Sequence, residues 1–244
     1  MSKIRICYLY SGILNPAGDF GNLKALVRHL EQNKIASEII NHKSGEKINA
    51  KDFDIFYLGG AQDFDRDAIL DDMRVTGNAE EIKTAIESGK TFLAIGGGYE
   101  LLGKYFETLD KKQIECLDIL DFYTIDSNNR EAKNFLFEVS DAGKVAGFEN
   151  HSGRTFLGPN IRPLGQVLVG EGNNGEDKTE GARFKNTFCT YAGGPVLVKN
   201  PDFCNLILSA ATDKNIKTTN IFENAAHNYL VERLESTKHT SSNF

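Results

Sequence analysis

The chain has no tryptophan and only four cysteines, two methionines and five prolines among 244 residues. The cysteines, Cys7, Cys116, Cys189 and Cys204, are far apart and form no CxxC pair. This spacing argues against a zinc site and against a disulfide framework. Most of the cysteines lie in apolar runs, so we expect small buried side chains. We predict neither a metal nor a cofactor.

Long hydrophobic runs and basic clusters are also missing. No apolar run approaches the roughly 20 residues of a membrane-spanning helix. The first eight residues, MSKIRICY, lead directly into a strand pattern and contain no secretion signal. The net charge is −6 and no Lys/Arg cluster stands out, which disfavours nucleic acid and anionic membranes as partners. We therefore expect a cytoplasmic, soluble protein.

The composition is that of an ordinary globular chain, with 40% hydrophobic and 25% charged residues. In the first half, apolar runs at 4–10, 36–40, 54–58 and 91–95 predict strands, and helical spacing predicts helices over 20–33, 78–88 and 97–106. Asn78, three residues before Glu81, resembles a capping box. Such alternation is typical of a mostly parallel sheet covered on both faces, with right-handed crossovers.

The second half is richer in strands, which we expect at 119–123, 135–139, 145–148, 166–170 and 187–191. Residues 170–177 form a long polar, glycine-rich loop, and two helices are expected at 202–213 and 224–234. We predict a single α/β domain over 1–235 with an antiparallel region in its second half. The polar tail 236–244 is expected to be frayed.

The segment TFLAIGGGYELLG at 91–103 carries the strongest chemical signal. A buried strand ends at a turn of small residues and a helix begins at once, as in a nucleophile elbow. A phosphate-binding loop is the alternative. It fits poorly, because Tyr99 and Glu100 stand where a Walker A loop has Lys and Ser or Thr, and Leu101 stands where GxGxxG needs glycine.

This segment resembles the CGGYQ-LG elbow of the GatD family, the glutaminase subunits of lipid II isoglutaminyl synthase. That family belongs to the cobyric-acid-synthase-like class I glutamine amidotransferases. Further resemblances follow the same order along nearly the whole chain: LN…GD.GN at 14–22, LGGGQD at 58–63, ILDFYT at 119–124, GFENHGGRT at 147–155, GYGNNGEDK at 170–178 and TYLHGPLLPKNP at 190–201.

The resemblance implies a three-layer, flavodoxin-like fold and a glutaminase mechanism. A cysteine at the elbow attacks the side-chain amide of glutamine, a histidine moves protons, and backbone N–H groups form the oxyanion hole. Ammonia passes to a MurT-like synthetase of the Mur ligase family, which supplies the acid that orients the histidine. The resemblance places Gly60, Ala61, Gly97, Glu100 and Arg130 at the glutamine pocket.

The chain departs from the family pattern where that chemistry should be. Gly96 stands at the cysteine position and Gly193 at the histidine position. Glu100 and Arg66 each stand where a glutamine is usual, and Ala61 replaces a glycine. Glycine has no side chain to attack a carbonyl or carry a proton, and losing either member of a dyad removes most of the acceleration. We expect no glutaminase activity by the family mechanism.

Plainer interpretations accompany the remaining candidates. Cys189 lies on the strand expected before Gly193 and is more simply a buried residue than a substitute nucleophile. His151, inside a shared motif, is more simply a residue that orders a loop. Glu100 suits a solvated position in the first turn of a helix. Arg130 fits a pocket and an ordinary loop equally. The other histidines, His29, His42, His227 and His239, look like surface residues.

Three functions remain open at this point. The chain is a catalytically inactive GatD-like subunit that serves as scaffold or regulator of a synthetase supplied with free ammonia. Or it is an active glutaminase whose dyad positions were substituted by design, or rescued by another residue. Or it is a sensor that binds glutamine or a small amide in the vacant pocket. The partner and its neighbouring gene would discriminate among them.

Overall fold

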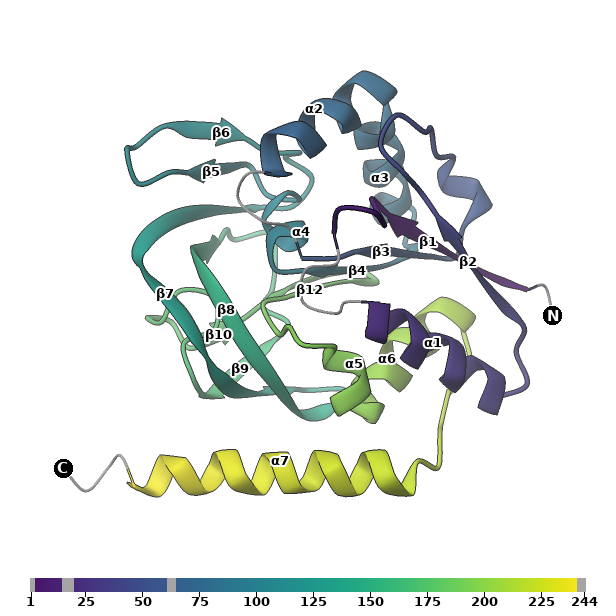
Figure 1. Ribbon diagram of the computed structural model, residues 1–244, viewed down its shortest axis with the longest axis vertical. Coiled ribbons are helices and arrows are strands. Elements are labelled where there is room, and N and C mark those ends of the chain that lie inside the picture. The colour runs from purple at the N-terminus through teal and green to yellow at the C-terminus, as the bar shows by residue number, and fades with distance from the viewer. Residues whose placement is uncertain (1–2, 15–19, 61–64, 241–244) are drawn as a thin grey trace.

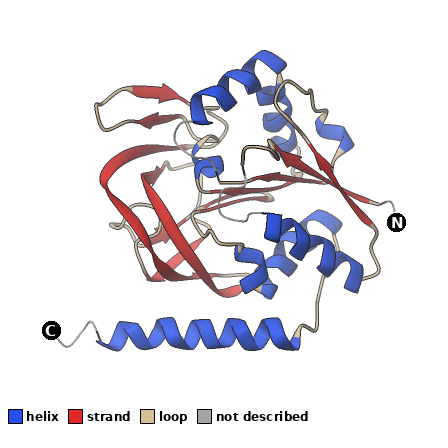
Figure 2. Cartoon of the chain, in the orientation of Figure 1, coloured by secondary structure: helices blue, strands red, loops and turns tan. Residues whose placement is uncertain are grey.

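The protein consists of two β-sheets that lie next to each other and are flanked by helices (Figures 1 and 2). The structure is a computed structural model that describes residues 3–14, 20–60 and 65–240, with only the backbone course at 237–240. Strands and helices alternate in the first half, as predicted, and the second sheet comes largely from the second half. The predicted α/β class is confirmed.

The first sheet is mostly parallel. Its strand order is β11-β12-β4-β3-β1-β2, and only the β11–β12 pair is antiparallel. Every residue of the central strands β3, β4 and β12 is buried, which explains why they are continuous apolar runs and not alternating patterns. The strands span Ile4–Leu9 (β1), Ser37–Asn41 (β2), Ile55–Leu58 (β3), Thr91–Ile95 (β4), Ala182–Phe184 (β11) and Thr187–Thr190 (β12).

Helices cover both faces of this sheet. The sheet therefore separates two hydrophobic cores, one on each face. Phe92 packs into the core on one face, and Leu93, the next residue, packs into the core on the other. Figure 1 shows the first face beneath α2, α3 and the short helix η1, and the second beneath α1, α5 and α6. The helices span Phe20–Gln32 (α1), Ala50–Asp52 (η1), Arg66–Thr76 (α2), Asn78–Glu87 (α3), Val196–Lys199 (α5) and Pro201–Thr212 (α6).

The second sheet is built around one long antiparallel hairpin. The strands expected at 119–123, 135–139 and 145–148 are replaced by β7 and β8, which pair along most of their length. Sequence periodicity missed the middle of this hairpin because residues 126–134 are mostly polar and partly exposed. The strands span Tyr105–Glu107 (β5), Gln113–Glu115 (β6), Phe122–Val139 (β7), Gly143–Leu157 (β8), Gly165–Val169 (β9) and Thr179–Glu180 (β10).

The prediction of a helix over 97–106 is wrong beyond the first turn. Helix α4 spans only Gly97–Glu100, and β5 begins at Tyr105. Leu101 and Leu102 lie in the turn between α4 and β5 and are fully buried. They are apolar because they belong to the core, and not because they form the apolar face of a helix. Gly103 then passes so close to Phe122 that a Cβ atom would lie 2.4 Å from its ring.

The capping box predicted at Asn78 is also wrong. Gly77, at φ 81°, precedes helix α3 and provides no side-chain cap. The Asn78 side chain accepts from the Ile48 N–H (3.0 Å), and the Glu81 carboxylate accepts from the Ala50 N–H (2.7 Å). Both side chains therefore hold the loop that leads into β3.

Helix boundaries and histidine positions need further correction. Helix α7 spans Ile221–Thr240, so it begins before and ends after the expected 224–234, and residues 236–240 are helical although we expected a frayed tail. The last four residues lie outside the described part. Helix α2 was missed, although Arg66, Ile69, Leu70 and Met73 show helical spacing and are all buried. His29 and His42 are buried, contrary to expectation.

No helix in the described part of the chain is long and apolar enough to cross a membrane. This agrees with the lack of a long apolar run in the sequence.

A buried carboxylate lies where the two sheets meet. Glu180 ends β10 and is 0% exposed. Its Oε1 accepts hydrogen bonds from the Thr190 hydroxyl (2.6 Å) and the Tyr191 N–H (2.8 Å), whereas Oε2 has no partner among the described residues. Burial raises the pKa of Glu180 from 4.5 to about 7.

We predict that Glu180 makes stability fall as pH rises. The folded state holds the Glu180 proton more tightly than the unfolded chain, so folding is favoured below pH 4.5 and loses that advantage between pH 4.5 and about 7. The loss is on the order of 2–3 kcal/mol. Urea unfolding of wild type and Glu180→Gln at pH 5 and pH 8 measures it. The wild type should lose more stability than the variant, and equal losses would contradict the assignment.

Candidate functional site

The predicted elbow is present at the end of β4. Gly96 has φ 53° and ψ −122°, outside the regions that side chains favour. Its N–H donates to the Thr190 carbonyl at the end of β12 (2.9 Å), and its own carbonyl accepts from the Glu100 N–H (3.1 Å). The backbone therefore turns from a central strand into helix α4 within one residue, with Gly96 at the apex.

The loop after β3 lies directly against this turn. Among the described residues, an ideal Cβ on Gly96 would have only Gly60 Cα, at 3.9 Å, as a neighbour, so these residues leave room for a side chain at the apex. At Gly98 a Cβ would meet the Gly59 carbonyl at 2.4 Å, so helix α4 can approach this loop only with glycine there. Gly60, Gly96 and Gly97 thus form one edge of the site, while the predicted pocket residue Ala61 lies outside the described residues.

Gly193 follows the neighbouring parallel strand. It comes three residues after β12, which pairs with β4, and its N–H donates to the Phe148 carbonyl of β8 (2.9 Å). A Cβ there would lie 3.4 Å from that carbonyl, an ordinary contact. At Gly194 a Cβ would lie 3.2 Å from Nζ of Lys199, an amine whose pKa is lowered by burial. Gly96 and Gly193 thus follow the carboxyl ends of adjacent strands.

Glu100 is not the solvated carboxylate that we expected. Its side chain is 6% exposed and pairs at 2.9 Å with Arg66, whose side chain is also 6% exposed. The Arg66 guanidinium lies 3.5 Å from the centre of the Phe106 ring. Both positions depart from the family pattern that the sequence resembles. Their opposite charges were the signal that could have paired them.

The ion pair continues into a buried hydrogen-bond chain. The Tyr191 hydroxyl donates to Glu100 Oε1 (3.1 Å), and burial followed by the Glu100 charge raises the pKa of Tyr191, so the hydroxyl keeps its proton. Because that proton is used, Thr155 donates to the Tyr191 oxygen (2.7 Å) and Thr124 to the Thr155 oxygen (2.8 Å). The elbow of the first sheet is thereby tied to β7 and β8 of the second.

Arg130 lies in the middle of β7, where the register of its pairing with β8 shifts between Asp126 and Glu131. It is exposed, and its Nε donates to the Asn150 side chain (2.8 Å). In the described part of the chain it is not among the residues brought together around Gly96. This placement fits an ordinary surface arginine better than a pocket residue.

Cys189 is a core residue. It is 0% exposed and pairs in register with Ala94 of β4. Burial raises the pKa of its thiol, so the reactive thiolate is disfavoured. The plain interpretation of Cys189 fits this environment.

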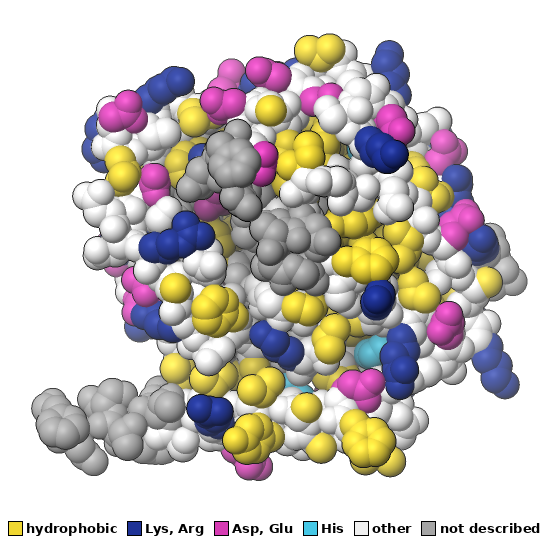
Figure 3. All heavy atoms as spheres, viewed as in Figure 1, with side chains coloured by type: hydrophobic (Ala, Val, Ile, Leu, Met, Phe, Trp, Pro, Cys, Tyr) yellow, Lys and Arg dark blue, Asp and Glu magenta, His cyan; other side chains and the backbone are white. Residues whose placement is uncertain are grey.

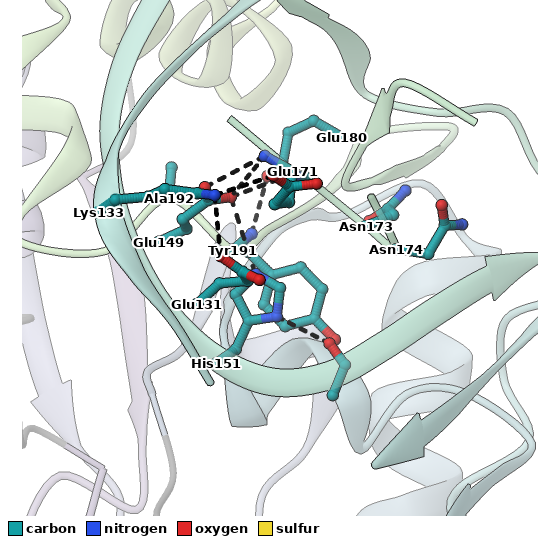
Figure 4. Close-up of polar contacts among 12 residues, drawn as sticks. Glu131, Lys133, Glu149, His151, Glu171, Asn173, Asn174, Glu180, Tyr191 and Ala192 are labelled. Atoms are coloured by element: carbon teal, nitrogen blue, oxygen red, sulfur yellow. Dashed lines mark hydrogen bonds and ion pairs between the residues drawn. The ribbon is translucent and has the colours of Figure 1, made fainter. Parts of the chain in front are cut away.

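His151 orders the structure around the glycine-rich loop (Figure 4). Its ring stacks on Tyr191 with 3.8 Å between centres, and its Nδ1 lies 2.7 Å from the Gly153 carbonyl, which makes Nδ1 the donor. Burial lowers the pKa of His151 to about 4, so the ring is neutral at physiological pH. Nearby, the buried Glu149 carboxylate accepts from the N–H of Gly172 (3.0 Å) and fixes the start of the loop.

The two shared motifs at 147–155 and 170–178 therefore build one polar region. Lys133 links Glu131 and Glu171 there with two 2.9 Å ion pairs. A pocket of about 210 Å³ lies beside it, lined by Ser127, Asn129, Glu131, His151, Ser152, Gly153, Arg154, Glu171, Gly172, Asn174 and Gly175. No group of three or more His, Cys, Asp or Glu side chains in the described ranges could hold a metal.

We predict that Gly96→Ala destabilises the protein by on the order of 1–3 kcal/mol. Gly96 has a positive φ and no described residue would clash with its Cβ, so the expected cost comes from the backbone. Gly193→Ala is the matched control. It adds the same methyl group in ordinary contact without a positive φ, and should change stability by less than about 1 kcal/mol. Thermal and urea unfolding give both values, and equal stability of the two variants would rule out strain at Gly96.

We predict strong coupling between Arg66 and Glu100. Arg66→Gln or Glu100→Gln alone removes one charge of a buried ion pair, which typically costs roughly 3–5 kcal/mol. The double variant removes both charges and should lose clearly less than the sum of the single losses. A double-mutant cycle by urea unfolding measures the coupling. Additive losses would show that the pair does not stabilise the elbow.

Comparisons with known proteins identify the family of the chain. Residues 6–201 match the CobB/CobQ-like glutamine amidotransferase domain. The subunit GatD of lipid II isoglutaminyl synthase (glutamine-hydrolyzing) from Staphylococcus aureus (strain N315) is 37% identical over 214 residues, which are 88% of this chain and 86% of the relative. The same subunit from Streptococcus pneumoniae (strain ATCC BAA-255 / R6) is 34% identical over 220 residues, 87% of this chain and 82% of the relative.

Solved structures support the fold. A glutamine amidotransferase from Thermotoga maritima superimposes with a TM-score of 0.56 at 14% identity, covering 96% of this chain and 99% of its own. The glutaminase domain of Trypanosoma brucei CTPS, solved with bound acivicin, gives 0.50 at 13% identity, covering 87% and 95%. Both likenesses concern the fold alone. By its matched domain and its full-length relatives, the chain belongs to the CobB/CobQ-like glutamine amidotransferase family and, within it, to the GatD family.

Proposed function

We propose that this chain is the GatD-type subunit of a lipid II isoglutaminyl synthase-like complex and that it does not hydrolyse glutamine. One observation carries the proposal: the elbow backbone is in place, but its apex is Gly96 and the adjacent strand end leads to Gly193. A glutaminase of this fold needs a nucleophile at the first position and a proton carrier at the second. Neither position has a side chain.

The thiol of Cys189 and the imidazole of His151 do not supply a replacement dyad. Cys189 is buried and its pKa is raised, and it sits within the strand and not at its end. His151 is stacked on Tyr191, hydrogen-bonded to a carbonyl, and neutral. Both side chains are held in packing contacts. This supports a site without glutaminase activity over a site in which Cys189 or His151 replaces the missing catalytic residues.

The Arg66–Glu100 pair supports a natural loss of activity and not a laboratory substitution. Two further positions differ from the family pattern, and the side chains that occupy them compensate each other in a buried contact of 2.9 Å. Exchange of the nucleophile and base by design would not require this pair. The interior below the elbow has changed as a unit, as expected for a chain that no longer has to bind and hydrolyse glutamine.

The proposed partner is a MurT-like synthetase of the Mur ligase family. The relatives from Staphylococcus aureus and Streptococcus pneumoniae are named as subunits of lipid II isoglutaminyl synthase. If this chain retains such a partner without producing ammonia, the synthetase must draw on free ammonia. The subunit then acts as a scaffold that shapes or stabilises the synthetase.

We predict that the complex of this chain with its synthetase amidates lipid II with ammonium chloride but not with glutamine as nitrogen donor. The chain alone should release no ammonia from glutamine above a heat-denatured control. Mass spectrometry after treatment with an electrophilic glutamine analogue should find no labelled residue. Ammonia release, or labelling of Cys189, would overturn the proposal.

Variants separate a decayed site from a repurposed one. Gly96→Cys alone should stay inactive, because no base stands at Gly193. Gly96→Cys with Gly193→His restores both chemical groups, and the addition of Arg66→Gln and Glu100→Gln also restores the family's neutral pocket. Activity that appears only with all four changes would show that the ion pair itself excludes glutamine.

A further inference from the structure

Helix α7 has two apolar stripes, and the structure covers only one of them. The inner stripe, Leu230, Val231 and Leu234, packs with Leu136 and Ala146 of the β7–β8 hairpin. His227 extends it by one turn, with Nδ1 3.1 Å from the Lys199 carbonyl of α5. This stripe anchors the helix to the body of the protein.

The outer stripe faces solvent. It consists of Phe222, Ala225, Ala226 and Tyr229, at the i, i+3, i+4, i+7 spacing of one helix face, and all four are exposed. Phe222 is 87% exposed and Tyr229 is 62% exposed. Figure 3 shows hydrophobic side chains in a row along this helix at the lower edge of the molecule.

A helix that is apolar on two faces is normally covered on both. Contiguous exposed apolar side chains mark interaction sites, and aromatic residues are enriched in protein interfaces. A membrane surface fits less well, because α7 carries Glu223, Glu232 and Glu235 against Arg233 and Lys238, whereas interfacial membrane helices are rich in Lys and Arg. The chemistry of the stripe favours a protein.

The area of the stripe argues for a partner that extends beyond it. The outer stripe runs over eight residues, or about 12 Å of helix, and a face about 10 Å wide gives roughly 120 Å². A specific interface buries about 800 Å² on each side. A second copy that touched only this stripe would fall short, so the occupant must also cover neighbouring surface.

The neighbouring surface leads towards the vacant site. Helix α5 packs against α7 and exposes Val198 at 45%. It begins three residues after Gly193. A partner that covers both the outer stripe and Val198 therefore contacts the short helix that follows the Gly193–Gly194 turn.

We propose that the outer stripe of α7, together with Val198, is the docking surface for the synthetase subunit, which it seats over the vacant site. This inference rests on the proposed function, because the partner class comes from there. To the proposed function it adds the surface of this chain that binds the synthetase, with Phe222 and Tyr229 as its main contacts. It also adds the orientation in which the synthetase binds.

The test uses the full chain and the purified Mur-ligase-type subunit of the same organism, with binding measured by calorimetry. Phe222→Ser with Tyr229→Ser should weaken binding more than tenfold. Val75→Ser is the matched control: Val75 is 86% exposed on α2, at the opposite edge of the molecule in Figure 1, and its change should leave binding unaltered. Because all three residues are exposed, melting temperatures should stay near that of the wild type.

The outcomes separate the two proposals. Hydrogen exchange in the complex should show protection of residues 222–229 and 196–199. If the wild type does not bind the synthetase, the proposed function fails. If the wild type and the double variant bind equally well, the function stands and the docking surface is wrong. If the free chain is a dimer that the double variant dissociates, the stripe joins two copies and the inference is overturned.

Discussion

The buried contact between Arg66 and Glu100 connects the parts of the site. Glu100 closes the single turn of α4, whereas Arg66 opens α2, so the pair joins the elbow to the helix that follows the β3 loop. Through Tyr191, Glu100 also connects to the second sheet. An ion pair this deeply buried stabilises only if its remaining hydrogen-bonding capacity is used, and Tyr191 and the Phe106 ring contribute to that. The elbow therefore keeps its shape through contacts that need no catalytic side chain.

An elbow without a nucleophile is physically easier to keep than one with it. The backbone at φ 53° and ψ −122° is costly for any residue with a Cβ, and an active enzyme accepts that strain in order to present its nucleophile. Glycine removes most of the strain and leaves the turn intact. The proposed loss of the nucleophile would thus carry no structural penalty, and the fold would persist in the proposed role of holding a partner.

Sequence predicted the features that single segments determine by themselves. The run 91–95 is apolar because β4 is buried on both faces, and three consecutive glycines allow the turn at Gly96, so strand and elbow were predictable. Residues 101–106 were wrongly predicted to be helical. Leu101 and Leu102 lie in a turn and are apolar because their side chains are buried in the core. Glu100 was misjudged because its partner lies 34 positions away. Local periodicity cannot reveal whether a charge in a first helical turn faces solvent or a buried arginine.

Helix α7 is a second case in which local periodicity misled the prediction. Its two stripes, at 222–229 and 227–234, are offset by five positions, or about 140° around the helix. Their periodic signals largely cancel, so the sequence predicted a short helix where a helix of 20 residues stands. Among the described residues the outer stripe is exposed, which leaves two aromatic rings in contact with water. A sequence that stabilised only this fold would place polar residues there. The proposed assembly with a synthetase would cover this face and would account for its apolar residues, because docking needs the partner and not the reaction.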